Sequence, residues 1–519
     1  MNRNLLIDKL QSTAYFDILI IGGGATGLGT AVDAAARGYS TLLLEKEDFA
    51  KGTSSRSTKL VHGGVRYLQQ GNIKLVMEAL KERGILKKNA AHLVKNQSFI
   101  VPNYKWWEGP YYGLGLKVYD WMSGSLGLGT SKWLSTEEVL QLAPTLDPEG
   151  LRGGVVYHDG QFDDARLAIN LAQTAVEQGA IVLNHFAVTG LLKSGNKIQG
   201  VKAIDNITKK EYEIKAKAVV NATGVFSDSI QQMDEPRRQA SISPSQGIHI
   251  VLDKDFLPGD AAIMIPHTDD GRVLFAVPWH QKIIVGTTDT LVNEISEEPR
   301  ALKEEVDFVL QHAARYLTKD PSISDVKSVF AGLRPLVKTA AKRTAEISRD
   351  HSILISESGL ISIVGGKWTT YRKMSEDVVN AAAVHGQLFY KECNTEELAI
   401  HGCMPVSDFT ANGYYYGSDR LPISELEKEK PELKDKIHPS LPYTKAQLVW
   451  AVQNEMCLTL EDALARRTRA LLLDAKAAIE CAGEVAKLLA KQLGRDEEWI
   501  NEQVISFQTI ANNYLPLKN

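Results

Sequence analysis

The start of the chain carries the feature that most constrains its fold. An apolar run begins at Asp17 and leads into a glycine turn, an alanine-rich helix that stops at Gly38, and a second apolar run ending at Glu45. The turn reads Gly22-x-Gly24-x-x-Gly27. Strand, glycine turn, helix, strand and acidic residue, in this order, form the dinucleotide-binding βαβ unit. The alternative, a glycine-rich turn in an ordinary parallel sheet, leaves the acidic end of the second strand unexplained.

Each residue of this unit has a predicted role. Gly22 permits the tight turn, Gly24 lets the backbone approach a pyrophosphate, and Gly27 allows the helix to pack on the strand. The helix N-terminus presents N–H groups and a partial positive charge to the phosphates. The carboxylate of Glu45 can accept hydrogen bonds from a ribose diol.

Composition indicates a large enzyme with sizeable cores. The chain has 519 residues, 44% of them hydrophobic, and a net charge of −4, which argues against a nucleic-acid partner. Its four cysteines show no CxxC spacing and do not cluster with histidines, so we expect reduced thiols and no metal site. Residues 1–15 lack the apolar core of a secretory signal, and no charge-free run reaches transmembrane length.

The pattern along the chain predicts an α/β protein with an interrupted nucleotide fold. Helices are expected at 73–93, after the capping box at Ser135, from Asp163 to Gly179, at 301–316 and at 367–384. Short strands at 181–193, 197–204 and 211–220 are typical of an antiparallel meander, and strand patterns dominate 246–286. We therefore expect a nucleotide-binding domain over 1–390, interleaved with a substrate-binding sheet domain at roughly 90–150 and 240–345, and a helical domain over 395–519.

A second dense motif runs from Thr53 to Leu68, just after the second strand of the βαβ unit. It reads Thr-Ser-Ser-Arg-Ser-Thr-Lys-Leu-Val-His-Gly-Gly-Val-Arg-Tyr-Leu. Hydroxyls, basic groups and a glycine pair suit a crevice lined for phosphates. Taken alone, the stretch is equally typical of a polar loop that enters a helix.

Several ordered motifs together resemble one family. They are Gly22 to Gly29, Thr53 to Tyr67, Asp163-Asp-Ala-Arg166, Asn221-Ala-Thr-Gly224, Val285-Gly-Thr-Thr-Asp289, Ala331-Gly-Leu-Arg-Pro335 and Gly365-Gly-Lys-Trp-Thr-Thr-Tyr-Arg372. The set resembles FAD-dependent glycerol-3-phosphate dehydrogenase of the aerobic, quinone-linked bacterial type. The stretch Thr459 to Arg469 resembles the C-terminal domain of that family, so the resemblance covers nearly the whole chain.

The resemblance implies both a fold and a reaction. The fold is an FAD-binding Rossmann-like domain of the glutathione-reductase/D-amino-acid-oxidase type, with an inserted antiparallel-sheet substrate domain and an all-α C-terminal domain. The reaction is oxidation of sn-glycerol 3-phosphate to dihydroxyacetone phosphate, with hydride transfer from C2 to FAD and electrons passed to membrane quinone. An oxidase that makes hydrogen peroxide on the same substrate is the nearest alternative, although the added segment typical of that relative has no obvious place here. An amine-oxidising relative and a binding module without turnover are more distant alternatives.

The resemblance also implies substrate-binding and catalytic residues. The substrate phosphate is a dianion, and the residues expected to bind it are Arg66, Tyr67, Arg334, Lys367 and Thr370. His249 is the expected base for the C2 hydroxyl, with His62 as the second choice. Arg334 can instead stabilise the developing alkoxide, and Lys367 can add a positive charge beside the cofactor. The plain alternatives are a core histidine at 249, which alternates with apolar residues, and a surface charge or loop salt bridge at 334.

The expected FAD contacts extend beyond the first turn. They are Gly22, Gly24, Gly27, Glu45, Thr53, Ser54, Ser55, Lys59, His62, Val188, Gly224, Gly365, Gly366, Lys367 and Thr369. Residues 103–121 are rich in Trp and Tyr and include Lys105 and Lys117, which is typical of a membrane-interface surface. The alternative for this segment is an aromatic cap over the active site. The resemblance implies a cytoplasmic protein attached peripherally to the cytoplasmic face of the inner membrane, and it leaves a homodimer open.

Overall fold

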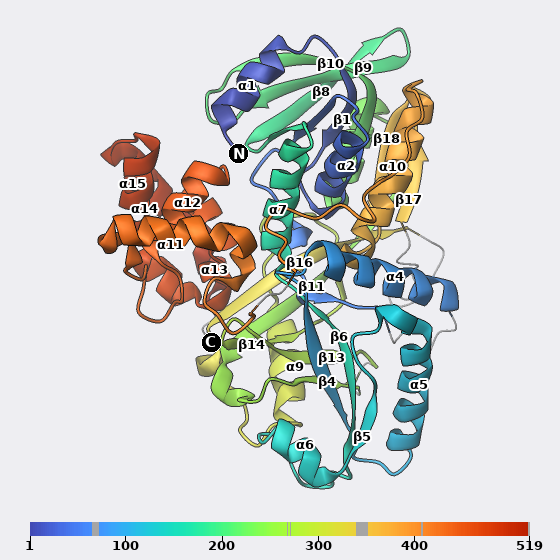
Figure 1. Ribbon diagram of the computed structural model, residues 1–519, viewed down its shortest axis with the longest axis vertical. Coiled ribbons are helices and arrows are strands. Elements are labelled where there is room, and N and C mark those ends of the chain that lie inside the picture. Colours follow the sequence, from blue (N-terminus) through green and yellow to red (C-terminus); the bar gives the residue numbers. More distant parts are fainter. Residues whose placement is uncertain (65–71, 267, 270, 339–350, 406–407, 517–519) are drawn as a thin grey trace.

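The computed structural model describes residues 1–64, 72–266, 268–269, 271–338, 351–405 and 408–516. Two β-sheets stand one above the other, and a group of helices from the C-terminal part of the chain lies against one side (Figure 1). The first sheet contains the predicted nucleotide-binding unit. The second sheet is built from segments that interrupt the first in the sequence.

The first sheet is parallel at its centre. Its order is β17-β18-β10-β1-β2-β7, and β1 pairs in parallel with both β10 and β2. Helix α2 packs against α7 and α10, while β8, β9 and β10 form the predicted antiparallel meander. The elements around this sheet are α1 (Arg3–Ser12), β1 (Phe16–Ile21), α2 (Ala25–Ala36), β2 (Thr41–Leu44), α4 (Ile73–Asn89), α7 (Asp164–Glu177), β7 (Ile181–Leu183), β8 (Phe186–Ser194), β9 (Lys197–Asp205), β10 (Glu211–Asn221), α8 (Ser227–Asp234), β17 (His351–Ile355), β18 (Leu360–Gly365) and α10 (Tyr371–His385).

The second sheet is largely antiparallel and follows the order β15-β11-β14-β13-β12-β4-β6-β3, with β16 on β11 and β5 on β6. Its strand β6 lies beyond residue 150, so the inserted part extends further along the chain than we expected. The elements are β3 (Leu60–Val61), β4 (Lys95–Pro102), α5 (Glu108–Ser123), β5 (Lys132–Leu134), α6 (Thr136–Leu142), β6 (Gly154–Gln161), β11 (Ile242–Asp253), β12 (Ala262–Ile265), β13 (Leu274–Trp279), β14 (Lys282–Gly286), β15 (Thr290–Leu291), α9 (Lys303–Ala314) and β16 (Ser328–Val337).

The C-terminal part is helical, as the amphipathic spacing predicted. Asp474 caps the longest of these helices, which ends at Gly494 in the left-handed conformation. The elements are α11 (Arg420–Glu429), α12 (Lys445–Asn454), a π-helical turn η10 (Asp462–Arg467), α13 (Ala470–Leu473), α14 (Ala475–Leu493) and α15 (Glu497–Ala511). The predicted N-caps at Ser135 and Asp163 are present as well.

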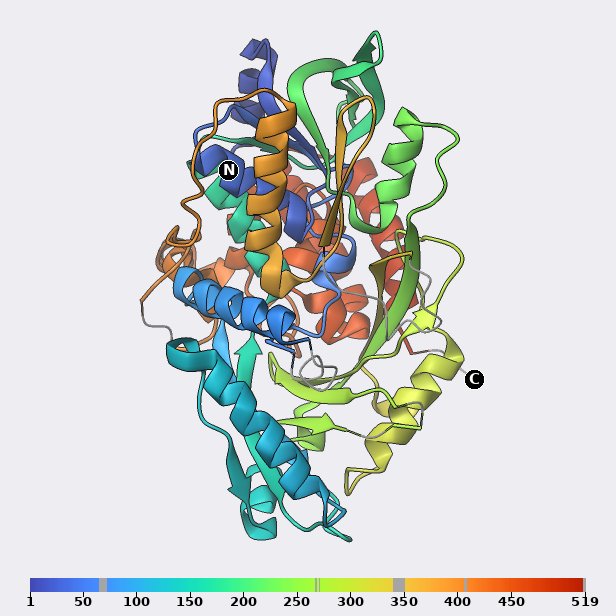
Figure 2. The same cartoon turned by 90° about the vertical axis from the view of Figure 1, so that its right-hand side faces the viewer.

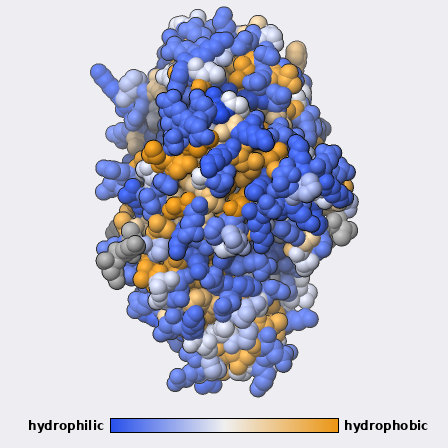
Figure 3. Space-filling view, turned by 90° about the vertical axis from the view of Figure 1, so that its left-hand side faces the viewer, coloured by the Kyte–Doolittle hydropathy of each residue, from blue (hydrophilic) through white to orange (hydrophobic). Residues whose placement is uncertain are grey.

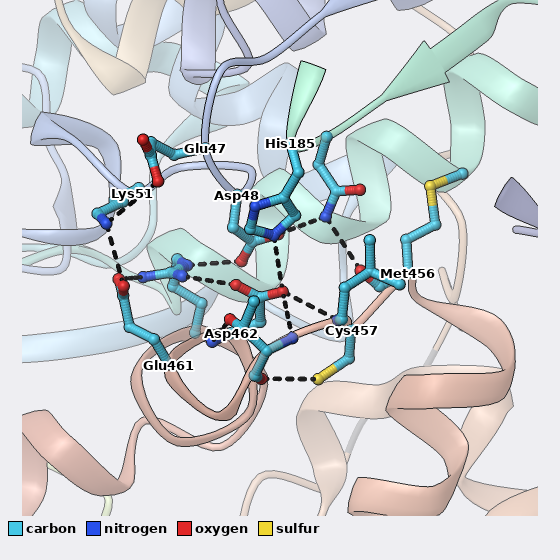
Figure 4. A network of polar contacts seen from close by, with 12 residues as sticks. Glu47, Asp48, Lys51, His185, Met456, Cys457, Glu461 and Asp462 are labelled. Atoms are coloured by element: carbon cyan, nitrogen blue, oxygen red, sulfur yellow. Dashed lines mark hydrogen bonds and ion pairs between the residues drawn. The ribbon is translucent and has the colours of Figure 1, made fainter. Parts of the chain in front are cut away.

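A buried polar network joins this helical part to the first sheet (Figure 4). Asp48, which follows β2, accepts from the guanidinium of Arg466 at 2.6 Å and from that of Arg467 at 2.7 Å. His185 lies 3.0 Å from Asp462. The ligand-type atoms of Asp48, His185 and Asp462 lie within 4.8 Å of one another. Guanidinium groups already neutralise both carboxylates, so this cluster is poorly suited to bind a metal ion. It instead joins the helical part to the first sheet.

The surface on the side of the C-terminal helices is mostly hydrophilic, with patches of apolar side chains between the hydrophilic ones (Figure 3). Within the described ranges, no helix combines the length and the apolar character needed to cross a bilayer. Several large apolar side chains are exposed on α5, namely Tyr111, Leu114, Val118 and Trp121.

Candidate active site

A cavity of about 1200 Å³ extends between the two sheets and is lined by both. Its volume exceeds the roughly 300–1,000 Å³ of ordinary ligand pockets, which leaves room for a large cofactor and a small substrate together. The predicted site residues that line it are Gly22, Gly24, Glu45, Thr53, Ser54, His62, Val188, Gly224, His249, Arg334, Gly365, Gly366, Lys367 and Thr369. Residues separated by more than 300 positions in the sequence therefore meet at one site.

The dinucleotide turn forms one end of the cavity. Gly22 has a φ of 106°, and a side chain there would press on the carbonyl of Ala222 at 2.8 Å. Gly27 lies behind the wall, where a Cβ would fall 1.9 Å from the oxygen of Gly22, in keeping with its predicted packing role. At Gly24 a Cβ would meet only Ser54 Oγ, at 3.0 Å. The space in front of Gly24 is thus open to a ligand.

Glu45 stands at the end of β2, where the ribose of a dinucleotide is expected. Its carboxylate accepts from the backbone N–H of Gly23 at 2.5 Å and from that of Glu47 at 2.8 Å. Burial raises the pKa of this carboxyl, while the two backbone N–H groups favour its charged form. Each carboxylate oxygen has a second lone pair, so both remain able to accept from a diol.

The hydroxyl-rich loop after β2 runs along the cavity wall. Ser54 Oγ accepts from the backbone N–H of Ala25 at 2.9 Å and so supports the start of α2, and Thr53 Oγ1 donates to Leu333 O at 2.5 Å. Ser55 and Lys59 differ from our expectation, because both lie behind the lining. The Lys59 ammonium is buried and donates to Ser55 O and to Asp164 Oδ2, both at 2.7 Å.

The glycine pair before α10 forms another part of the cavity wall. Gly366 has a φ of 85°, and a Cβ there would lie 2.3 Å from Met374 Sδ. The pair positions Lys367, which lines the cavity directly before the short helix η7 (Trp368–Thr370). Trp368 Nε1 donates to Ser54 O at 2.9 Å, which ties the two walls together. Thr370 is buried and does not reach the lining.

His249 lies on β11, and its ring lies in the cavity wall. Its Nε2 is 2.9 Å from Thr58 Oγ1, and its ring stacks on Phe330 with centroids 4.9 Å apart. Burial, and after it the cations Lys59 and Arg334, lower the pKa of His249 well below 6.5. The imidazole is therefore neutral at pH 7 and able to accept a proton. A Cβ on Gly286, its cross-strand neighbour, would lie 2.4 Å from the ring, so only glycine leaves it room.

Arg334 reaches the cavity from β16, beside β11. Its guanidinium donates to Thr287 Oγ1 at 3.0 Å and to Asp289 Oδ1 at 3.3 Å. A Cβ on Gly247 would fall 2.3 Å from this guanidinium. Gly247 and His249 are two residues apart on β11 and therefore lie on the same face of the strand. The strand that presents the imidazole thus also leaves space for the Arg334 side chain.

Two predicted substrate residues, Arg66 and Tyr67, lie outside the described part of the chain. Sequence reasoning assigned no role to Thr58 or Asp289, although both line the cavity. Thr58 contacts His249, and Asp289 holds Arg334. Each occurs inside a motif already quoted, and this membership was the available signal.

The cavity suits a dinucleotide at one end. Gly24 leaves a cradle that a side chain would fill, the N-terminus of α2 borders it, and Glu45 stands at the ribose position. Near the other end, Lys367 and Arg334 supply positive charge and His249 a neutral imidazole. This donor set fits an anionic cofactor together with a small anionic substrate.

Comparisons with known proteins agree with this fold. Residues 17–372 match the family model described as FAD dependent oxidoreductase, and residues 361–500 match the C-terminal domain of alpha-glycerophosphate oxidase. The chain is 38% identical to the mitochondrial glycerol-3-phosphate dehydrogenase of Schizosaccharomyces pombe, with 96% of this chain and 87% of that protein covered. It is also 38% identical to the human mitochondrial protein of the same name, with 97% and 74% covered.

Solved structures give the same picture. The glycerol-3-phosphate dehydrogenase from Bacillus halodurans complexed with FAD superposes with a TM-score of 0.78 and 30% identity, covering 100% of this chain and 98% of that one. An L-alpha-glycerophosphate oxidase from Mycoplasma pneumoniae with FAD bound shares the fold, with a TM-score of 0.54 and 17% identity over 74% of this chain and 98% of its own.

Proposed function

Because the chain belongs to the family of FAD-dependent glycerol-3-phosphate dehydrogenases, we propose that it oxidises sn-glycerol 3-phosphate to dihydroxyacetone phosphate and passes the electrons to membrane quinone. One observation carries the proposal: the neutral His249 and the cations Arg334 and Lys367 line the same cavity as the dinucleotide turn. When bound, FAD supplies the acceptor for the hydride that leaves C2.

The protein's own side chains bind the substrate and move its proton. Arg334 and Lys367 attract the phosphate dianion, and the planar fork of arginine matches its oxygens. His249 accepts the proton of the C2 hydroxyl, since its imidazole lines the cavity and is unprotonated before the reaction. His62, which also lines the cavity, is the second candidate for this role. Arg66 and Tyr67 remain predicted phosphate ligands.

Substitution of Arg334 separates binding from chemistry. If Arg334 holds the phosphate throughout the reaction, Arg334→Met should raise KM and leave kcat nearly unchanged. Loss of one charge-assisted contact costs roughly 1.5–3 kcal/mol, or about 10- to 100-fold in kcat/KM. Arg315→Met, which removes an exposed arginine paired with Asp269, is the control and should leave both constants unchanged. A fall in kcat at unchanged KM would assign Arg334 to the alkoxide instead.

The quinone part of the proposal rests on an apolar part of the cavity lining. Phe99 and Tyr157 stack there at 5.2 Å, and Tyr112, Met264 and Phe275 complete the wall. A flat apolar acceptor gains buried contact on such a surface, whereas molecular oxygen needs none.

The acceptor is tested with an oxygen electrode. We expect substrate-dependent reduction of a soluble quinone or dye at a rate far above the rate of oxygen uptake. Rapid oxygen uptake with hydrogen peroxide in stoichiometric yield would contradict the proposed acceptor and favour the oxidase.

We further propose that α5 contacts the membrane, on the cytoplasmic face of the inner membrane. Tyr111, Leu114, Val118 and Trp121 follow helical spacing and form one exposed stripe; Leu114 is 69% and Trp121 82% exposed. This helix lies on the face of the molecule shown in Figure 2. Trp107, Tyr111 and Tyr112 also line the cavity. The two interpretations of the aromatic segment are thus compatible, because α5 both carries the exposed stripe and lines the cavity, with Tyr111 in both sets, and a lipid-soluble acceptor would have a short path to the site.

A vesicle assay tests this surface. The double substitution Leu114→Glu/Trp121→Glu should weaken flotation with phosphatidylglycerol vesicles by at least about tenfold, since each buried apolar side chain contributes roughly 1.5–3 kcal/mol. Phe389→Glu is the matched control, because Phe389 is 93% exposed and lies more than 250 residues from α5 in the sequence. Equal flotation of the double variant and the control would place the membrane contact elsewhere.

A further inference from the structure

The contact between Thr58 and His249 lies in a loop that one buried carboxylate, Asp164, binds on both sides of Thr58. Asp164 Oδ2 accepts from Ser57 N at 3.1 Å, from Ser57 Oγ at 2.7 Å and from Lys59 Nζ at 2.7 Å. The residues on both sides of Thr58 are therefore bound to the same oxygen. Lys59 has a φ of 64°, a left-handed conformation that costs a non-glycine residue about 1–2 kcal/mol. Such a backbone persists only when neighbouring contacts hold it.

The other oxygen of Asp164 is held from the C-terminal part of the chain. Arg469 donates to Asp164 Oδ1 at 3.0 Å and, through the same nitrogen, to Ser55 O at 2.8 Å. Ser55 O also accepts from Lys59 Nζ at 2.7 Å. Arg469 thus contacts both the carboxylate that fixes the loop and the start of the loop itself. All four residues are buried.

The charges favour Arg469 as the permanent partner of this carboxylate. Burial lowers the pKa of Lys59 to about 7, against the raising effect of Asp164, so the ammonium is close to losing its proton. An arginine stays charged under the same conditions. The positive charge that always balances Asp164 therefore comes from the helical C-terminal part.

We propose that Arg469 is a positioning residue for the oxidation step: through Asp164 it fixes the 55–59 loop, which holds the Thr58 hydroxyl against His249 Nε2. Thr58 is the hydrogen-bond partner that the described residues provide to this ring, so its hydroxyl, together with the stacking on Phe330, holds the orientation of the imidazole. The C-terminal helical part thereby contributes to catalysis without reaching the cavity. This inference rests on the proposed role of His249.

The test uses the FAD-loaded enzyme and anaerobic stopped-flow mixing with sn-glycerol 3-phosphate. Arg469→Gln should lower the limiting rate of flavin reduction by about 10- to 100-fold with little change in substrate affinity, because small misplacements of a catalytic group have effects of this size. Thr58→Val should do the same, and Thr58→Ser should restore most of the rate. The double variant Arg469→Gln/Thr58→Val should be no slower than Thr58→Val, since both act through one contact.

Arg467→Gln is the matched control. Arg467 is equally buried, lies two residues away and pairs with Asp48, but it does not contact the 55–59 loop. We expect this variant to unfold at a lower temperature and to reduce flavin at the wild-type rate. Amide hydrogen exchange of residues 53–60 should increase in Arg469→Gln and stay unchanged in Arg467→Gln. Should Arg469→Gln fold poorly, Ser57→Ala removes one bond to Asp164 and should give a smaller loss of rate in the same direction.

Two results would overturn the proposal. One is a wild-type reduction rate in folded Arg469→Gln or Ser57→Ala, and the other is additive loss in the double variant. His249→Ala in the same assay tests the proposed role of His249 independently of the positioning role of Arg469. A normal rate in that variant removes His249 as the base, whereas a slow His249→Ala beside a normal Arg469→Gln removes only the positioning role.

Discussion

Replacement of His249 by alanine should slow anaerobic flavin reduction by sn-glycerol 3-phosphate by about 10²–10⁴-fold, the contribution of a well-placed general base. The imidazole is neutral because burial and two nearby cations depress its pKa, and it lines the cavity beside Arg334. Proton removal matters only as the hydride leaves, so kcat should fall while the affinity for substrate changes little. Stopped-flow absorbance of the flavin at saturating substrate measures this rate.

The matched control is His92→Ala. His92 is also buried and has its pKa lowered to about 4, but it contacts Asn170 and is absent from the cavity lining. Its loss should lower stability and spare the reduction rate. If His249→Ala reduces flavin as fast as the wild type, the base lies elsewhere, and His62 becomes the next residue to replace.

Replacement of Gly24 by valine should abolish stable FAD binding. A Cβ at this position meets only Ser54 Oγ within the protein, so the folded chain tolerates it, but the added branches fill the space where the pyrophosphate approaches the backbone. We expect at least a roughly 100-fold loss of FAD affinity, or about 2.8 kcal/mol. The flavin-to-protein absorbance ratio after gel filtration, together with circular dichroism, measures both binding and folding.

Gly483→Val, at a helical site with open space, controls for the general effect of adding a side chain. A yellow Gly24→Val protein with a full complement of FAD would mean that the cofactor does not pass in front of Gly24.

Local patterns allowed much of the fold to be predicted from the sequence. The βαβ unit, the caps at Ser135 and Asp163 and the helical C-terminal part depend on spacing and on neighbouring residues, which the sequence shows directly. The extent of the inserted sheet was harder to predict. Strand β6 belongs to it because it pairs with β3, β4 and β5, and nothing within 154–161 reveals those partners.

The candidate site shows the same contrast between features set by neighbouring residues and features set by distant ones. Gly24, Glu45, His249 and Arg334 line the same cavity, and each occupies a strand end or an alternating strand position that the sequence pattern indicates. Lys59 was expected beside the cofactor and instead pairs with Asp164, about 100 residues away in the chain. That pairing forms only when the chain folds, so the residues next to Lys59 in the sequence do not reveal it. The roles that we infer for Thr58 and Arg469 could be recognised only once the structure had placed the 55–59 loop between them.

The central claim is that this chain oxidises sn-glycerol 3-phosphate with its own FAD. Anaerobic mixing of the purified FAD-loaded protein with this compound tests it most directly, with glycerol and proline as comparison compounds. We predict that the flavin absorbance bleaches with sn-glycerol 3-phosphate alone, and that one dihydroxyacetone phosphate forms per flavin. An unchanged flavin spectrum with sn-glycerol 3-phosphate, or bleaching by proline instead, would contradict the account.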